Sequence, residues 1–137
     1  MHHWVMDHLG KPWLAGARGP NAFDCWGWLV WCYRQHHGID LPVWAGVDPK
    51  DKRRVSGIML DSTEPGSDWI ATTAPVDFCA VALSQSKIIH HVGLYLAIDR
   101  GVVVHACDGK GLIAQPVHQL PASGWRTIQF YRHRALS

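Results

Sequence analysis

The residue types that carry thiol and imidazole chemistry are abundant in this chain, whose 137 residues include 4 Cys, 10 His and 8 Trp. Cys25 is the cysteine best placed for chemistry, because it follows Asp24 at or near the first turn of a predicted helix. The backbone N–H groups and the macrodipole at a helix N-terminus favour a thiolate, which is the reactive form of cysteine. Cys25 is therefore a candidate nucleophile. The alternative is a buried structural cysteine, the more common role of a free thiol.

A nucleophilic cysteine requires a base within hydrogen-bonding distance and a group that orients this base. His91 opens a predicted strand, and alternation places it on one face with Gly93 and Tyr95. His105 ends the next predicted strand, so a hairpin makes it the expected cross-strand neighbour of His91. There it would hold the second ring nitrogen of His91 and set its tautomer. The alternative for His105 is a histidine satisfied within the core.

The other cysteines and histidines are expected to have no chemical role. Three cysteines belong to this group, Cys32 and Cys79 as buried structural residues together with Cys107. Six histidines are predicted to lie at the surface, namely His2, His3, His36, His37, His118 and His133. A zinc site is a third interpretation of the Cys and His content. The Cys25–Cys32 and His90–His91 spacings do not match the ligand pairs of zinc modules, so we expect no metal and no cofactor.

The elements that must position these residues follow a helix-then-strand order. Apolar spacing predicts a short helix over residues 2–9 and a longer helix over 22–37 that is closed by Gly38. Residues 44–75 show no clear pattern. Strands are predicted over 76–83, 90–98, 101–107, 111–117 and 125–132. Helices followed by an antiparallel meander are typical of an α+β fold.

Length and composition indicate one folded domain and exclude several functional classes. A chain of 137 residues favours one domain over residues 1–137, and 47% hydrophobic with 18% charged residues excludes disorder. The net charge of +2 is too small to indicate a nucleic-acid partner. No apolar run approaches the ~20 residues of a membrane helix, and the N-terminus has no signal-peptide pattern. We therefore expect no membrane insertion, and we expect synthesis in a reducing cytoplasm.

Several segments in order resemble the motifs of the NlpC/P60 cysteine peptidases. The segment around Cys25 is similar to their Asp-Cys-Ser-Gly motif, and the segment that starts at His91 is similar to their His-Val-Gly-Ile-Tyr strand. The segment around His105 resembles the later strand with their third catalytic polar residue. The segments are residues 23–30, 75–78, 91–96 and 104–106. The resemblance covers residues 4–132 and is weakest over 44–74.

This resemblance implies a papain-like α+β fold in which N-terminal helices pack on a C-terminal antiparallel sheet. It implies that Cys25 is the nucleophile, His91 the general base and His105 the group that orients His91. The backbone N–H of Cys25 would help to stabilise the oxyanion. The expected reaction is hydrolysis of an amide bond in a peptidoglycan stem peptide through an acyl-enzyme.

Four further residues are weaker candidates for the substrate or oxyanion site. Trp13 stands where the family commonly has a Tyr, and Trp26 stands where it has a Ser. An indole N–H donates a hydrogen bond but cannot transfer a proton as a phenol does. Arg18 would hold a substrate carboxylate, with a solvated loop arginine as the alternative. Asp24 is expected to accept hydrogen bonds at the helix start.

The segments 10–13, 16–20 and 38–42 resemble the phage and prophage tail-tip branch of the family. This resemblance implies that the protein acts in the phage tail at the cell wall, with other tail-tip proteins as possible partners. A different class of function is also compatible with the sequence. It is a structural tail-tip or assembly module with the same fold and little activity, which the substitutions at Trp13 and Trp26 favour.

Overall fold

The computed structural model describes residues 3–41, 68–85 and 91–136. Within these ranges it contains one α-helix and a six-stranded antiparallel sheet, which is the predicted α+β class. The elements are α1 (Cys25–His37), β1 (Trp69–Thr72), β2 (Ala80–Ser84), β3 (His91–Leu96), β4 (Val102–Cys107), β5 (Gly111–Pro116) and β6 (Thr127–His133). Short 3-10 helices cover Trp4–Asp7, Val117–Gln119, Pro121–Ser123 and Arg134–Leu136. None of the helices in the described ranges is long and apolar enough to span a membrane.

The sheet is more than the predicted meander. Its strand order is β1-β6-β2-β3-β4-β5, so only β2 to β5 follow one another in space as in the sequence. The last strand, β6, returns to pair with β2, and β1 pairs with its outer edge. β1 lies in the region without a clear sequence pattern and was not predicted. Adding β6 and β1 to the far side of β2 places β2 inside the sheet, with a neighbouring strand on each side.

Several predicted boundaries need correction. The predicted helix over 2–9 is only the 3-10 turn Trp4–Asp7, and the long predicted helix begins at Cys25 instead of residue 22. Gly38 closes that helix in the left-handed conformation, as predicted. β2 begins at Ala80, because the chain before it turns with a hydrogen bond from Cys79 N–H to the Val76 carbonyl (3.1 Å). His90 and residues 44–67 of the stretch without a clear pattern lie outside the described residues.

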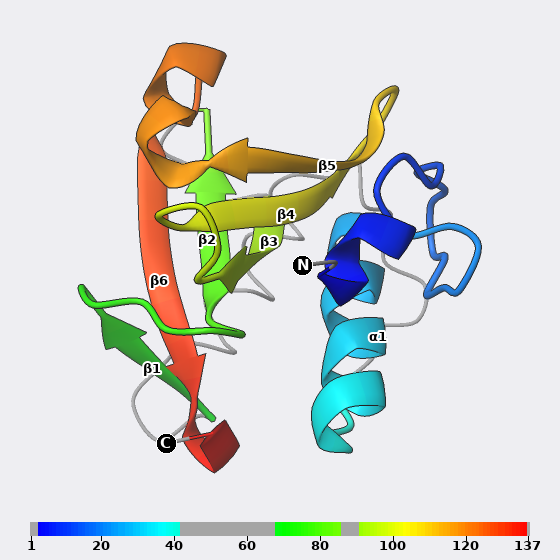
Figure 1. Cartoon of the computed structure of the whole chain (residues 1–137), viewed down its shortest axis with the longest axis horizontal. Helices are drawn as coiled ribbons and strands as arrows, with labels where there is room; N and C mark the ends of the chain where they lie inside the picture. The colour runs from blue at the N-terminus through cyan, green and yellow to red at the C-terminus, as the bar shows by residue number, and fades with distance from the viewer. Residues whose placement is uncertain (1–2, 42–67, 86–90, 137) are drawn as a thin grey trace.

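Apolar residues fill both faces of the sheet. One cluster lies between α1 and the strands and includes Val92, Leu94 and Val104. The Trp28 indole of α1 donates a hydrogen bond to the Val104 carbonyl (3.1 Å), which anchors the helix on β4. Tyr95 belongs to a second cluster on the other face. Figure 1 shows α1 beside the sheet, with the N-terminal loop near the β4–β5 turn.

Candidate active site

The start of α1 is fixed by the Asp24 carboxylate. Its Oδ1 accepts a hydrogen bond from the Gly27 N–H (2.6 Å), as an N-cap residue does. Its Oδ2 accepts from the Gly16 N–H (2.9 Å) and so binds the preceding loop to the helix. The loop packs closely, because a Cβ added to Gly27 would lie 2.0 Å from the Ala17 carbonyl oxygen. The predicted capping role of Asp24 is confirmed, and it holds Cys25 as the first residue of the helix.

Cys25 is a buried thiol with 8% of its surface exposed. Burial, together with a smaller effect of the neighbouring Asp24 carboxylate, raises the pKa of the Cys25 thiol to about 12. Contacts with the backbone N–H groups of Val92 and Trp26 lower this pKa, but by less. The helix N-terminus favours the thiolate, as expected, but desolvation outweighs this effect. The thiol is neutral at rest, and its attack on a substrate requires a base.

The two strands that carry the candidate histidines separate next to Cys25. Pairing between β3 and β4 ends at Leu94 and Val104, although β3 begins at His91 and β4 continues to Cys107. Val92 lies within this stretch, and its N–H contacts the Cys25 thiol. The start of the helix therefore meets the sheet where β3 has lost its partner β4.

The predicted contact between the two histidines is present. Nε2 of His91 lies 2.8 Å from Nδ1 of His105, and both residues are buried. The register places Leu94 opposite Val104, so the two histidines are diagonal neighbours instead of directly opposite residues. Gly93 makes this diagonal contact possible, because a Cβ at this position would lie 3.1 Å from the Cβ of His105.

A chain of hydrogen bonds sets the protons on both rings. Nε2 of His105 lies 2.7 Å from Oε1 of Gln115, whose Nε2 donates to the Ser123 hydroxyl (3.0 Å). Because the amide oxygen only accepts, His105 carries its proton on Nε2 and accepts at Nδ1. Burial lowers the pKa of His105, which favours this neutral form. His91 then donates from Nε2, and its Nδ1 is the unprotonated, basic nitrogen.

Three residues that contact the histidine pair were not predicted from the sequence. Trp125 stacks on the His91 ring with 5.2 Å between centroids and 10° between planes. Gln115 orients His105, and Cys107 Sγ lies 3.2 Å from Nδ1 of His105. Burial raises the pKa of the Cys107 thiol to about 11. Cys107 could have been found from its position two residues after His105, because alternate residues of a strand share a face.

The remaining predicted site residues lie around the start of α1. Trp13 is half-buried and its backbone forms a short bridge with Phe23. Trp26 is half-buried and packs edge-on against Trp69 with 6.5 Å between centroids. Arg18 is exposed in the loop before the helix. The structure thus brings the loop residues to the helix start, while the histidine pair lies on the strands.

Two expectations about the other histidines and cysteines have opposite outcomes. Cys32 and Cys79 are buried, as predicted. The prediction that His133 lies at the surface is wrong, because only 6% of this residue is exposed. Its ring lies 4.9 Å from Trp69 and 5.7 Å from Tyr33, measured between centroids. Pairing of β1 with β6 places Trp69 next to His133 and so buries a histidine that the sequence alone suggests is exposed.

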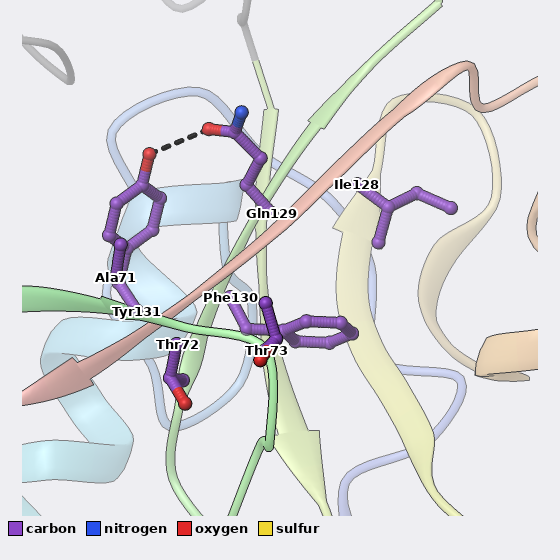
Figure 2. Close-up of a pocket in the computed structure, with 7 residues that line it drawn as sticks. All are labelled: Ala71, Thr72, Thr73, Ile128, Gln129, Phe130 and Tyr131. Carbon is purple, nitrogen blue, oxygen red and sulfur yellow. Dashed lines mark hydrogen bonds between the residues drawn. The ribbon is translucent and has the colours of Figure 1, made fainter.

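A groove of about 820 Å³ lies on β1 and β6, away from the histidine pair. Figure 2 shows its lining, in which the Tyr131 hydroxyl donates to the Gln129 side-chain oxygen (2.7 Å). The lining residues are Ala71, Thr72, Thr73, Ile128, Gln129, Phe130 and Tyr131. None of the predicted site residues belongs to this set, so we place the candidate active site at the start of α1 and β3.

The chain is similar to known proteins in sequence and in fold. The sequence model of the NlpC/P60 family matches residues 10–131. The probable endopeptidase p60 of Listeria seeligeri is 31% identical over 118 residues, which cover 86% of this chain and 18% of that protein. The probable endopeptidase p60 of Listeria grayi is 30% identical over 111 residues, which cover 76% of this chain and 19% of that protein. The chain thus spans about a fifth of the length of these curated relatives.

The fold is similar to a crystal structure of the NlpC/p60 domain of the peptidoglycan hydrolase SagA. The TM-score is 0.59 at 18% sequence identity, and the match covers 92% of this chain and 91% of that domain. The helix and sheet described above are therefore the fold of that domain.

Proposed function

Because the chain belongs to the NlpC/P60 family, we propose that it is a cysteine hydrolase that cleaves amide bonds in the stem peptides of bacterial peptidoglycan. The observation that carries this proposal is the ordered chain from Gln115 through His105 to His91. It leaves Nδ1 of His91 as a base at the first residue of β3. The Cys25 thiol contacts the backbone N–H of Val92, the next residue of this strand. The relatives named endopeptidase and peptidoglycan hydrolase support the same reaction class and substrate.

In the proposed reaction the Cys25 thiol gives its proton to Nδ1 of His91 while its sulfur attacks the carbonyl carbon of the scissile amide. His105 accepts the Nε2–H hydrogen bond of His91 and stabilises the imidazolium. The backbone N–H of Cys25 donates to the oxyanion, a contribution of ~10²–10³ in rate. The imidazolium then protonates the leaving amine, the C–N bond breaks, and a thioester with Cys25 remains. Water, deprotonated by His91, hydrolyses the thioester and restores the thiol.

The loop before α1 is the proposed contact region for the substrate. Arg18 is exposed there, and a guanidinium can hold a carboxylate of an acidic stem peptide with two parallel hydrogen bonds. Trp13 and Trp26 are half-buried on either side of the nucleophile in sequence. We propose that they form the apolar part of the peptide site, in place of the hydroxyl side chains that the family commonly has.

The test is digestion of purified peptidoglycan, followed by mass analysis of the released fragments. We expect wild type to release stem-peptide fragments, and Cys25→Ala to lower the rate by at least ~10³-fold because the nucleophile is lost. Cys32→Ala is the matched control, since it removes another buried cysteine of the same helix and should retain activity. Equal rates for wild type and Cys25→Ala would exclude this mechanism.

A structural role in the tail tip is the second proposal. The raised pKa of the buried Cys25 thiol favours it, because such a thiol is a poor nucleophile without efficient proton transfer. Circular dichroism would show whether an inactive wild-type protein is folded. A folded chain without peptidoglycan turnover, together with equal behaviour of Cys25→Ala, is the result that this alternative predicts.

We further propose, from the resemblance of residues 10–13 and 16–20 to the tail-tip branch, that the protein acts in a phage or prophage tail. Other tail-tip proteins would then be its partners. Mass spectrometry of purified tails from the producing bacterium tests this location. Detection of the chain in tails at a fixed ratio to a tail protein is the expected result, and its absence from them would contradict the proposal.

A further inference from the structure

Cys107 forms a triangle of metal-binding atoms with the two histidines. Its Sγ lies 3.2 Å from Nδ1 of His105 and 3.9 Å from Nε2 of His91, and these nitrogens are 2.8 Å apart. Each of the three residues offers one possible ligand atom, and these atoms all lie within 4.8 Å of one another. One thiol and two imidazoles form a ligand set that suits Zn²⁺. We propose that this triangle binds a zinc ion and that the bound ion inhibits the hydrolase; the inhibition, but not the binding, rests on the proposed function.

The dimensions of the triangle are close to those that zinc requires. Tetrahedral coordination with bonds of about 2.0–2.1 Å to nitrogen and about 2.3 Å to sulfur separates two nitrogens by about 3.4 Å, and nitrogen from sulfur by about 3.5 Å. Each observed edge lies within about 0.6 Å of these values. The edge between the nitrogens is short because a hydrogen bond now joins them. Zinc would replace the proton of this bond, and three protein ligands leave a fourth position for water.

Two of the three ligands are held in place by neighbouring side chains. A histidine that binds a metal through one nitrogen usually donates its other N–H to an acceptor that fixes the ring. His105 has this arrangement, because its Nε2 lies 2.7 Å from the Gln115 amide oxygen and Nδ1 is the atom inside the triangle. The ring of His91 is stacked on Trp125, which restricts its rotation. The two histidine side chains are therefore already ordered, and they lose little conformational entropy when zinc binds.

This ligand set differs from the pairs that the sequence spacing excluded. His105 and Cys107 are two residues apart on one strand, so both side chains lie on the same face. His91 joins them from β3, where this strand has separated from β4. Zinc modules place paired ligands close together in sequence, and a site that combines two strands does not show that signature.

Zinc binding would change the protons of the proposed catalytic site. Cys107 binds as a thiolate, so its proton is released to solvent. Nε2 of His91 binds the ion only after losing its own proton, and the neutral ring then carries its proton on Nδ1. In the proposed reaction Nδ1 must accept the proton of Cys25. The zinc form therefore has no base for the nucleophile, and a chelator that removes the ion restores it.

Titration of the chelator-treated full chain with Zn²⁺ in a calorimeter tests the binding. We expect one equivalent to bind, and Cys107→Ser and Cys107→Ala to weaken binding at least tenfold. Cys79→Ser is the matched control, because Cys79 is a buried cysteine whose Sγ accepts from the Val76 N–H (3.5 Å), as a serine hydroxyl can. It should bind zinc like wild type. Circular dichroism shows that each variant is folded.

Cobalt spectra identify the sulfur ligand. With Co²⁺ in place of zinc, wild type should show a thiolate-to-cobalt charge-transfer band that Cys107→Ser lacks and Cys25→Ser retains. Equal zinc affinity of wild type and both Cys107 variants would overturn the proposal. So would a band that disappears in Cys25→Ser and persists in Cys107→Ser, since the thiolate would then come from the nucleophile.

The activity measurement separates this proposal from the proposed function. Zinc should inhibit peptidoglycan hydrolysis by wild type. In Cys107→Ser the zinc concentration that gives half-inhibition should be at least tenfold higher. The rate of each protein is compared with its own rate without zinc. Hydrolysis that one equivalent of bound zinc leaves unchanged would overturn the inhibition. Zinc binding through Cys107 in a chain without hydrolase activity supports the site and contradicts the proposed function. Hydrolysis by a chain that binds no zinc would support the proposed function and contradict the zinc site.

Discussion

His105 and His133 are both buried, with 0% and 6% exposure, but their surroundings differ in kind. Both ring nitrogens of His105 face side chains that fix its protons, namely His91 and Gln115. The ring of His133 packs against Trp69, and its Nδ1 accepts from the Ala135 N–H (3.1 Å). A histidine in a directed chain of hydrogen bonds can move a proton to a nucleophile, whereas one packed among aromatic rings mainly fills space.

The strands explain this difference. Trp69 pairs directly with His133, so β1 and β6 remain joined and the ring is confined by its neighbours. Pairing between β3 and β4 stops at Leu94 and Val104. Residues 91–93 and 105–107 stay paired with β2 and β5, and the polar side chains of His91, His105 and Cys107 come together between them. The separated strands thus provide the place for chemistry, and the paired strands provide packing. Four substitutions or conditions test this contrast, in order of decreasing effect.

His91→Gln should lower kcat/KM by ~10²–10⁴-fold, because the variant has no basic nitrogen for the Cys25 proton. His133→Gln should leave kcat/KM close to the wild-type value. The measurement is the initial rate of fragment release from peptidoglycan at low substrate concentration. Equal losses of kcat/KM in the two variants would mean that both histidines act by stabilising the fold and that His91 has no separate chemical role.

Gln115→Leu should lower kcat at least about tenfold with little change in KM, because His105 loses the acceptor that fixes its tautomer. Gln115 is a positioning residue, so a conservative variant provides the control. Gln115→Glu keeps an acceptor for the His105 proton and should recover most of the rate. Steady-state kinetics separate kcat from KM, and equal losses in both variants would assign Gln115 a purely structural role.

Gly93→Ala should destabilise the fold by about 1–3 kcal/mol, the usual cost of overpacking a core. Its Cβ would lie 2.6 Å from Cγ1 of Val103 and 3.1 Å from Cβ of His105. Urea denaturation followed by tryptophan fluorescence measures this change. Gly109→Ala is the control, since its Cβ has no atom within 4 Å although its φ of 83° is strained. Only the Gly93 variant should also lose activity, because only it disturbs the diagonal histidine contact.

The free energy of unfolding should decrease as the pH falls from 7.5 to 5. Burial lowers the pKa of His133 below its ordinary value of 6.5, against the opposing effect of Asp68. The unfolded chain therefore binds more protons, so the contribution of His133 is complete above pH 6.5 and is lost as the pH falls through the folded-state pKa. Burial lowers the pKa values of His8, His36 and His105 in the same direction.

His133→Gln isolates one part of this pH effect. Its stability should fall less than that of wild type between pH 7.5 and 5, because one group that resists protonation has been removed. Thermal denaturation at several pH values measures the difference in slope. Parallel curves for the two proteins would show that His133 does not contribute, and that the remaining buried histidines account for the acid sensitivity.

Much of the site follows from local sequence. The capping residue Asp24, the place of Cys25 in the first turn of the helix and the alternation that groups His91 with Gly93 depend on neighbours within a few residues, and each was predicted. The residues that complete the site were not. Gln115 lies on β5 and Trp125 precedes β6, and no local pattern in the sequence relates them to His91.

By itself the sequence determined the α+β class, the helix that presents Cys25 and the strands that present His91 and His105, because capping, periodicity and turn chemistry act over short distances. Tertiary structure alone decided that Cys25 is a neutral buried thiol, that His133 is buried and that Gln115 and Trp125 contact the histidine pair. These properties depend on desolvation and on strand register. Both arise only when segments distant in the chain pack together.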